Sequence, residues 1–283
     1  MNRVKIITDS TSDLSPELLK RYDIQVVPLY VLIDDKSYKD GIEISTEKLY
    51  EEVEKRQVLP KTAAPSMGDF YTVFSKWIEE GYDCFYIGLS SELSATYQAA
   101  KMAAEEFDDS RIRFLDSRSL STGIGLLVLK AAELAEEGAG IEEICNTISR
   151  MIPKVRVSFI IDTLKYLHMG GRCTAVQLLA SNVLKLRPQI IVKDGGMVVG
   201  AKFRGKRSHC LDEFYNVLVG DGSQIDKERV FVTHSMCNEN EVSEYKERLE
   251  SIGVEEVIIT QAGTVISSHC GPGTIGIIYK EKE

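Results

Sequence analysis

The sequence predicts an α/β protein with two domains, and three observations support this prediction. β-rich runs alternate with helical patterns along the first half of the chain, as expected for a parallel sheet covered by helices. In the second half, Asp194-Gly195-Gly196 separates two strand-like runs, as in an antiparallel hairpin, so we expect a mixed sheet there. The chain has 283 residues, enough for two domains, and the pattern of predicted strands and helices changes near residue 153. We therefore expect an N-terminal α/β domain over 1–153 and a C-terminal α/β domain over 154–283, with a cleft between them.

The first half repeats a unit of strand, polar loop and helix. Residues 4–7 form a β-rich run that ends in Thr8-Asp9-Ser10, and Ser15 followed by Pro16 is typical of a helix start. Ser66 and Asp69 resemble a capping box. We expect further strands over 24–33, 84–88 and 111–115, and further helices over 47–55, from 66 to 80, and up to 137. This order predicts a mainly parallel sheet.

The second half contains both strand-like and helical segments. We expect strands over 155–161, 189–193, 197–202, 229–233, 256–260 and 274–279, and helices over 175–184 and 239–251. Because a hairpin pairs its strands in an antiparallel way, this sheet is expected to be mixed.

Composition and charge exclude several classes of protein. The 43 acidic and 34 basic residues give a net charge of -9, which disfavours nucleic acid as a partner. No uncharged apolar run approaches the length of a membrane span, and the N-terminus carries no signal-like apolar core. We therefore expect a cytoplasmic protein with no integral membrane segment. The six cysteines include no CxxC pair, so no zinc or redox motif is expected.

Hydroxyl side chains are concentrated where predicted strands end. The segment GLSSELSATYQAA, residues 88–100, places five hydroxyls within eight positions at a predicted change from strand to helix. Such a residue most often caps the helix by accepting a bond from a backbone amide, which is the plain interpretation of Ser66 and Ser94. A helix start also offers free amides and the positive end of a dipole, so these hydroxyls would equally suit a small anion such as a carboxylate.

The usual signatures of enzymes are mostly absent. There is no GxSxG, no HExxH and no complete phosphate-binding loop. Residues 271–276 match GxGxxG letter for letter, but no βαβ unit follows them, so we reject a dinucleotide site there. An enzyme acting on a small carboxylated or phosphorylated metabolite in the cleft remains an alternative, with Asp9, Asp116 and His269 as acid-base candidates.

Two basic segments allow either a plain or a functional interpretation. Residues 202–207 carry four positive charges in an acidic protein, which indicates either a solvated loop or a docking patch for a phosphate or an acidic partner. Gly170-Gly171-Arg172 indicates either a helix cap with a solvated neighbour or an arginine presented on an open loop.

An ordered set of motifs along the chain resembles the DegV family. These motifs are TDSTSDL at 8–14, KTAAPS at 61–66, LSSELSATY at 89–97, DS at 116–117, LKYL at 164–167 with GGR at 170–172, and HCGPG at 269–273. The match covers nearly the whole chain. The resemblance implies a bacterial fatty-acid-binding protein of two α/β domains, with the acyl chain buried and its carboxyl group near the domain junction.

The resemblance also implies a role and a set of site residues. Proteins of this family carry a long-chain fatty acid for a separate ATP-binding fatty acid kinase, which forms an acyl phosphate that feeds phospholipid synthesis. The lipid-binding chain itself is then not an enzyme, and it holds the fatty acid as its ligand with no cofactor and no metal. Thr62, Ser94 and His269 correspond to ligand-binding residues, and Arg172 and Arg204 to residues that present the head group to the kinase.

Three positions depart from the family pattern. Ala63-Ala64 stands where the family commonly has Ser-Gln, and Ala95 stands where it commonly has Gly. The departures change the polar groups available near the head group, while Thr62 and Ser94 are retained.

Overall fold

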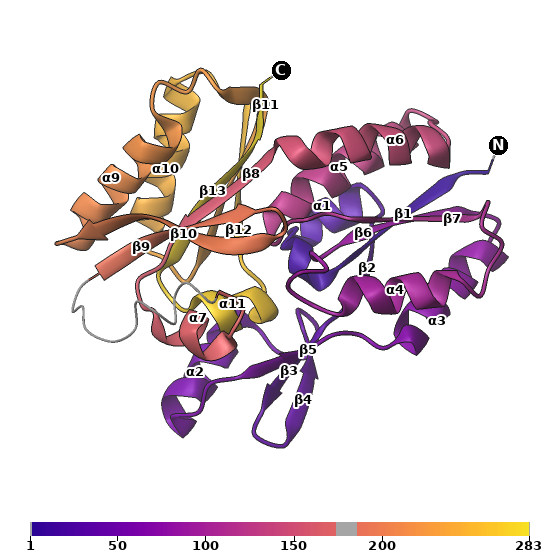
Figure 1. Cartoon of the computed structure of the whole chain (residues 1–283), viewed down its shortest axis with the longest axis horizontal. Helices are drawn as coiled ribbons and strands as arrows, with labels where there is room; N and C mark the ends of the chain where they lie inside the picture. Colours follow the sequence, from indigo (N-terminus) through magenta and orange to yellow (C-terminus); the bar gives the residue numbers. More distant parts are fainter. Residues whose placement is uncertain (1, 174–185, 283) are drawn as a thin grey trace.

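Two β-sheets with helices packed around them form most of the molecule (Figure 1). The computed structural model describes residues 2–173 and 186–282, so the helix expected over 175–184 lies outside the described residues. The α/β fold class is confirmed, with one all-parallel sheet and one mixed sheet.

The first sheet is built from the N-terminal half and is parallel throughout. Its strands lie in the order β2-β1-β6-β7. Their bounds are Val4–Asp9 for β1, Gln25–Val27 for β2, Asp83–Gly88 for β6 and Ile112–Asp116 for β7. Strand β6 is buried along its whole length, as expected for a central strand covered on both faces.

The second sheet is built from the C-terminal half and has six strands in the order β10-β9-β8-β13-β11-β12. The strands are β8 (Val155–Ile160), β9 (Leu186–Lys193), β10 (Gly196–Arg204), β11 (Ile225–Ser235), β12 (Glu256–Gln261) and β13 (Thr274–Glu281). The pair β11–β12 is parallel and the other pairs are antiparallel, so the expectation of a mixed sheet is confirmed.

A third sheet, which the sequence did not predict, joins β3 (Tyr30–Ile33), β4 (Lys36–Lys39) and β5 (Lys61–Ala63). The single strand expected over 24–33 is wrong: it is broken at Pro28-Leu29, and its two parts, β2 and β3, enter different sheets. Proline has no backbone N–H to donate to a sheet, which accounts for a break at this point. The break carries the chain out to the small sheet that contains Thr62.

Helices cover the sheets and fill the space between them. Their bounds are Pro16–Arg21 (α1), Thr46–Arg56 (α2), Met67–Glu79 (α3), Thr96–Ala104 (α4), Thr122–Glu136 (α5), Ile141–Met151 (α6), Lys165–Gly170 (α7), Arg207–Val219 (α9), Glu239–Ser251 (α10) and Thr264–Cys270 (α11). Among the described residues, Ser10–Ser12 and Ile152–Lys154 form short 3-10 turns between other elements.

Local capping signals in the sequence predicted helix starts well. Ser15 accepts a hydrogen bond from the Leu18 amide at the start of α1. Ser66 and Asp69 form the expected capping box at the start of α3. Residues 202–207, by contrast, are not simply a loop, because Lys202 to Arg204 belong to β10 and Arg207 begins α9.

Helix α5 connects the two halves through the core. It packs against β1 and β6 of the first sheet and against β8, β11 and β13 of the second. Most of its residues from Thr122 to Ala132 are buried, which is typical of a helix enclosed on all sides. The largest hydrophobic cluster accordingly contains side chains from both sheets, among them Phe85 and Ile278. The domain boundary at residue 153 stays a prediction.

The β9–β10 hairpin reaches back to the N-terminal half. At its tip, Asp194 and Gly195 have φ angles of 52° and 83°, as a two-residue turn of this kind requires. The Arg118 side chain donates a hydrogen bond to the Asp194 carbonyl. A Cβ at position 195 would lie 2.7 Å from Ser90 Oγ, so glycine is needed here for close approach as well as for its φ angle.

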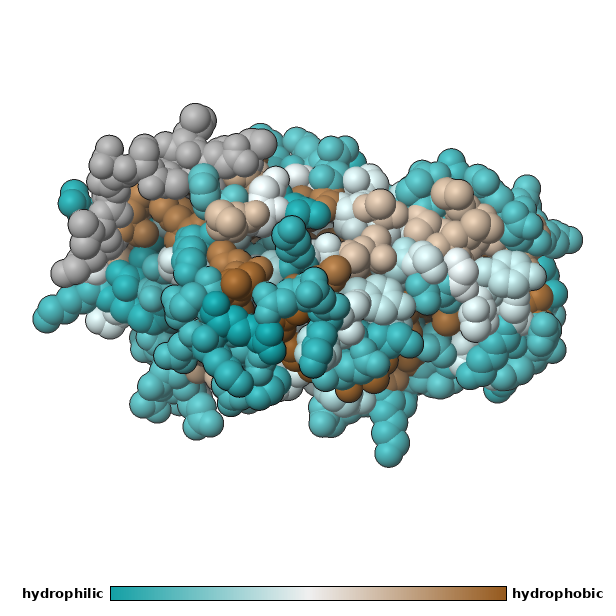
Figure 2. Space-filling view, turned by 90° about the horizontal axis from the view of Figure 1, so that it is seen from below, coloured by the Kyte–Doolittle hydropathy of each residue, from teal (hydrophilic) through white to brown (hydrophobic). Residues whose placement is uncertain are grey.

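The described residues were searched for membrane-spanning helices and for metal-binding clusters. No helix within 2–173 and 186–282 combines the length and the apolar character needed to cross a membrane. Within the same ranges, no group of three or more His, Cys, Asp or Glu side chains is arranged to hold a metal ion. Figure 2 shows the face that carries α2 and the small sheet as mainly hydrophilic, with hydrophobic residues visible between the hydrophilic ones.

Candidate functional site

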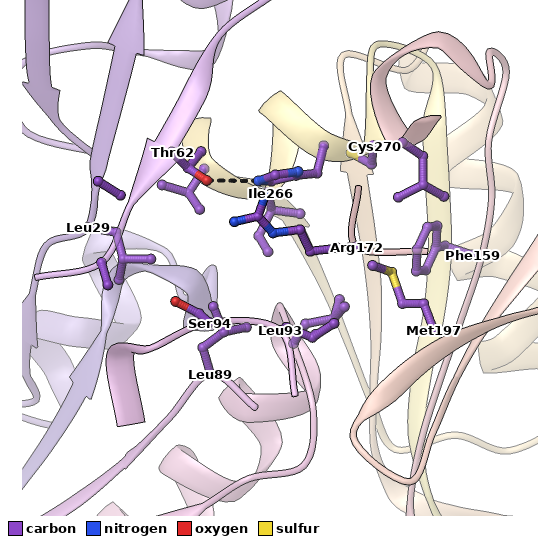
Figure 3. Close-up of a pocket in the computed structure, with 16 residues that line it drawn as sticks. Leu29, Thr62, Leu89, Leu93, Ser94, Phe159, Arg172, Met197, Ile266 and Cys270 are labelled. Carbon is purple, nitrogen blue, oxygen red and sulfur yellow. Dashed lines mark hydrogen bonds between the residues drawn. The ribbon is translucent and has the colours of Figure 1, made fainter. Parts of the chain in front are cut away.

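A mainly apolar cavity lies between the two halves of the protein (Figure 3). The space free of protein atoms is about 630 Å³, including its opening to solvent. The apolar wall is formed by Leu29, Leu89, Leu93, Leu120, Phe159, Leu167, Met197, Val265 and Ile266, together with Ala63, Ala64 and Cys270. These residues lie on both sides of residue 153, so the cavity requires both halves of the chain.

Four of the five expected site residues line this cavity and supply its polar groups. They are Thr62 at the centre of β5, Ser94 just before α4, Arg172 just after α7, and His269 in α11. Figure 3 shows Thr62 and Ser94 on one side of the cavity, Phe159 and Met197 on the other, and the Arg172 side chain between them. The structure therefore gathers residues from four separate elements.

Thr62 and His269 form the central polar pair. Thr62 Oγ1 and His269 Nε2 are 2.9 Å apart, and the dashed line in Figure 3 marks this hydrogen bond. Burial of the imidazole and, to a smaller extent, the nearby charge of Arg172 lower the pKa of His269 to about 4. Since histidine in water has a pKa of about 6.5, His269 is neutral near pH 7. It acts here as a hydrogen-bonding group and not as a cation.

The Ser94 hydroxyl satisfies a backbone amide at the start of α4, as the plain interpretation of this residue predicts, although Ser94 is not itself the N-cap residue. The N-cap of α4 is Ala95, whose side chain makes no capping bond. Ser94 Oγ lies 2.9 Å from Thr96 Oγ1 and accepts a hydrogen bond from the Thr96 amide at 3.3 Å. Ser66, in contrast, is confirmed as a helix cap and does not line the cavity. The two serines therefore have different local environments despite similar sequence signals.

Arg204 lies apart from the other four residues. It is exposed near the end of β10 and does not line the cavity. Its neighbour Arg207 is engaged in ion pairs with Asp162 and Glu241. The roles of Arg204 and Arg172 in presenting a head group stay predictions, and so do the ligand contacts of Thr62, Ser94 and His269.

The acid-base candidates of the alternative enzyme are not brought together. Asp9 is buried and accepts bonds from the Thr11 amide and hydroxyl, the Tyr86 hydroxyl and the Leu89 amide. Asp116 accepts bonds from Ser91 and from the Arg118 amide. Neither carboxylate lines the cavity, so His269 alone of the three reaches it.

Sequence reasoning missed two carboxylates that hold α11 in place. Asp13 accepts a hydrogen bond from the Gly263 amide at 2.8 Å, and Asp40 accepts one from the Thr264 amide at 2.7 Å. Burial raises the pKa of both carboxyl groups. Both residues come from the N-terminal half, whereas α11 carries His269. No short-range signal marks contacts between residues more than 200 positions apart.

A second, smaller cavity adjoins the first. Its space free of protein atoms is about 350 Å³, and it shares Leu120, Phe159, Ile266 and Cys270 with the larger cavity. Its other lining residues include Val157, Gly276 and Ile278 from the second sheet. The apolar space thus continues from the polar pair toward the second sheet.

Comparison with known proteins agrees with this architecture. The family model described as "Uncharacterised protein, DegV family" matches residues 3–282. A DegV domain-containing protein from Caldanaerobacter subterraneus subsp. tengcongensis is 35% identical over 283 residues, which cover 100% of both chains.

Two solved structures are similar over nearly the full length. A DegV family protein from Thermus thermophilus, described as binding fatty acid, superposes with a TM-score of 0.90 at 32% identity, over 99% of this chain and 100% of that one. DegV from Bacillus subtilis, described as a fatty acid binding protein, superposes with a TM-score of 0.87 at 28% identity, over 100% of both chains. The match of the family model over almost every residue, together with these relatives, shows that the chain belongs to the DegV family.

Proposed function

We propose that this protein binds a long-chain fatty acid and presents its carboxyl group to a separate ATP-dependent kinase, which forms an acyl phosphate for phospholipid synthesis in the cytoplasm. The observation that best supports fatty acid binding is a cavity with a mainly apolar wall and a small set of polar groups, Thr62, Ser94, Arg172 and His269. An amphipathic ligand with a long apolar chain and one small acidic group matches this distribution. Related proteins of this family are described as binding fatty acids.

The apolar wall supplies the affinity. Burial of each methylene gains about 0.8 kcal/mol, so about fourteen methylenes offer on the order of 11 kcal/mol before the costs of ordering the chain are subtracted. The smaller cavity next to Phe159 and Ile266 extends the apolar space that an acyl chain would use. These two apolar spaces support the proposal that a long acyl chain is retained tightly.

The polar end suits a carboxylate. A buried carboxylate without partners is unfavourable by several kcal/mol, and hydroxyl donors remove this penalty by hydrogen bonding to it. Thr62 and Ser94 offer such donors, and Arg172 offers a positive charge at the cavity. Because His269 is neutral near pH 7, it orients Thr62 without forming an ion pair that would hold the carboxylate back from a kinase.

Presentation to a kinase is supported by the placement of the arginines. The Arg172 side chain is exposed although it lines the cavity, so it lies where the ligand meets solvent. Arg204 is also exposed, on β10. We assign the phosphate donor ATP to the partner protein, and Arg172 and Arg204 to contacts between the head group and that partner.

Two measurements on the isolated protein and the kinase test this function. Calorimetric titration of the delipidated protein with palmitic acid is expected to show saturable binding of one ligand per chain. Addition of the kinase with radiolabelled ATP is expected to give palmitoyl phosphate only when this protein is present. Absence of saturable binding would contradict lipid binding, whereas binding without phosphoryl transfer would contradict only the kinase role.

A further inference from the structure

Gly170, the last residue of α7, lies directly against the ring of His269. A Cβ at position 170 would be 2.3 Å from His269 Nδ1 and 3.2 Å from Cε1. Ordinary contacts between non-bonded heavy atoms are about 3.5 to 4 Å, so no side chain larger than hydrogen fits while the ring stays in place. Helices α7 and α11 lie side by side (Figure 1), which brings the two residues together.

The ring is held from its opposite edge as well. His269 Nε2 is hydrogen-bonded to Thr62 Oγ1 at 2.9 Å, whereas Nδ1, which faces Gly170, is buried and has no hydrogen-bond partner among residues 2–173 and 186–282. A displacement of the ring away from position 170 would therefore disturb its bond with Thr62. The imidazole is fixed between a backbone on one side and a hydroxyl on the other.

This arrangement selects one tautomer. A proton on Nδ1 would be a buried donor without an acceptor, which is a rarer and more costly state than an acceptor without a donor. The proton therefore belongs on Nε2, which donates to Thr62 Oγ1. The Thr62 hydroxyl proton is then free to be donated to a ligand oxygen in the cavity.

The adjacent glycine has a different task. Gly171 has a φ of 66° and ends α7, and apart from Gly171 and its two chain neighbours no described residue has an atom within 4 Å of the position that its Cβ would take. Arg172 then turns back, and its Nη1 donates to the Gly170 carbonyl at 2.7 Å. Gly171 thus serves the backbone turn, whereas Gly170 serves the contact with His269.

We infer that Gly170 is a positioning residue for the head-group site: its missing side chain lets His269 hold Thr62 as a hydrogen-bond donor toward a carboxylate. This inference rests on the proposed function for the identity of the ligand. The contact between Gly170 and His269 can be tested without a ligand, through the stability of the protein and the NMR signals of the imidazole.

A double-mutant cycle between positions 170 and 269 tests the contact. Gly170→Ala is expected to lower the urea midpoint of unfolding and to alter the ¹⁵N NMR signals of the His269 ring. In the His269→Ala background the ring is gone, so the added methyl group has room and Gly170→Ala is expected to cause little further loss. Gly171→Ala is the matched control, because it strains a positive φ but leaves the His269 signals unchanged.

Binding of palmitic acid supplies the functional readout. Gly170→Ala is expected to weaken binding about tenfold, which is the loss of one hydrogen bond to a charged group. The same substitution in the His269→Ala background is expected to change the affinity less than twofold.

Two results would overturn the inference. One is a Gly170→Ala protein that keeps wild-type His269 signals and palmitic acid affinity. The other is a loss of stability on Gly170→Ala that is equally large in the His269→Ala background, where the imidazole is absent. If Gly170→Ala alone fails to fold, a double variant that also fails to fold, while His269→Ala folds, gives the same contradiction. Failure of the wild-type protein to bind palmitic acid would instead contradict the proposed function. The urea midpoints and the His269 NMR signals would still show whether Gly170 and the imidazole are in contact.

Discussion

Thr62 and His269 are 207 positions apart in the sequence, yet their side chains are hydrogen-bonded at 2.9 Å in the wall of the apolar cavity between the two halves of the protein. Thr62 lies in the small third sheet and His269 in a short helix that leads into β13. The bond therefore connects parts of the chain that fold into different elements, and the head-group site exists only when both are in place.

Removal of the cavity hydroxyls should weaken ligand binding while the fold stays intact. Thr62→Val and Ser94→Ala each remove a donor proposed to bind the carboxylate, so we expect about tenfold weaker binding of palmitic acid and slower kinase-dependent formation of acyl phosphate. Titration calorimetry and the coupled kinase assay measure the two effects. If both variants kept the wild-type affinity and the wild-type rate, Thr62 and Ser94 would not be ligands of the carboxylate.

Ser66 provides the matched control for Ser94. Because Ser66 caps α3 and does not line the cavity, Ser66→Ala should lower the free energy of unfolding by about 1 kcal/mol and leave the affinity for palmitic acid unchanged. Urea denaturation and calorimetry separate these outcomes. If Ser66→Ala weakened binding as strongly as Ser94→Ala, the distinction between cap and site would be wrong.

The buried imidazole should make stability depend on pH in a defined window. The pKa of His269 is lowered to about 4 in the folded protein, against about 6.5 in an unfolded chain. Below pH 6.5 the unfolded state takes up the proton more readily, so this contribution to stability is lost as the pH falls from about 6.5 to about 4. It amounts to on the order of 3 kcal/mol.

Comparison with His269→Gln isolates this effect. Glutamine does not titrate, so the variant should lack the part of the pH dependence between 6.5 and 4 that comes from His269. The buried carboxyl groups of Asp9, Asp13 and Asp40 have raised pKa values and act in the opposite direction, but they are common to both proteins. Parallel stability curves over this window would contradict a neutral, buried His269.

The tip of the β9–β10 hairpin should tolerate no side chain at position 195. Gly195→Ala combines a φ of 83° with contacts under 3 Å to Ser90 and Arg118, so we expect a loss of more than about 1 kcal/mol in unfolding free energy. Gly138→Ala is the control, because Gly138 has a φ of 87° and open space around its Cβ position. Equal losses of unfolding free energy in the two variants would show that the close contacts of Gly195 with Ser90 and Arg118 do not contribute to the cost of the substitution.

Arg204 should matter for the partner and not for the lipid. Because Arg204 is exposed and lies outside the cavity, Arg204→Ala should leave retention of palmitic acid unchanged and reduce turnover with the kinase. Arg150→Ala, at an exposed position on α6, should change neither. A loss of lipid retention on Arg204→Ala would contradict the docking role.

Much of the fold could be predicted from the sequence because its signals are local. The helix starts at Ser15 and Ser66 and the hairpin at Asp194-Gly195 depend on residues within a few positions of each other, and all three are confirmed. The small third sheet was missed because its strands have three or four residues each and one of them continues an apparent longer strand past Pro28. Strand pairing of this kind is decided by tertiary packing and not by local pattern.

The candidate site could be predicted only in part. Family resemblance pointed to Thr62, Ser94, Arg172 and His269, and the structure places all four around one cavity. The contacts of Asp13, Asp40 and Gly170 with α11 were not predicted, since each joins residues about 100 to 250 positions apart. Such contacts arise from the packing of whole elements, which no short motif records.

Native mass spectrometry of the protein purified without added ligand tests the central claim most directly. A mainly apolar cavity with a carboxylate-binding end should retain lipid from the expression host, so we predict a bound mass in the range of long-chain fatty acids that is released by organic extraction. A protein that carries no such mass, and that also shows no saturable binding when palmitic acid is supplied, would contradict the claim that it is a fatty-acid-binding protein.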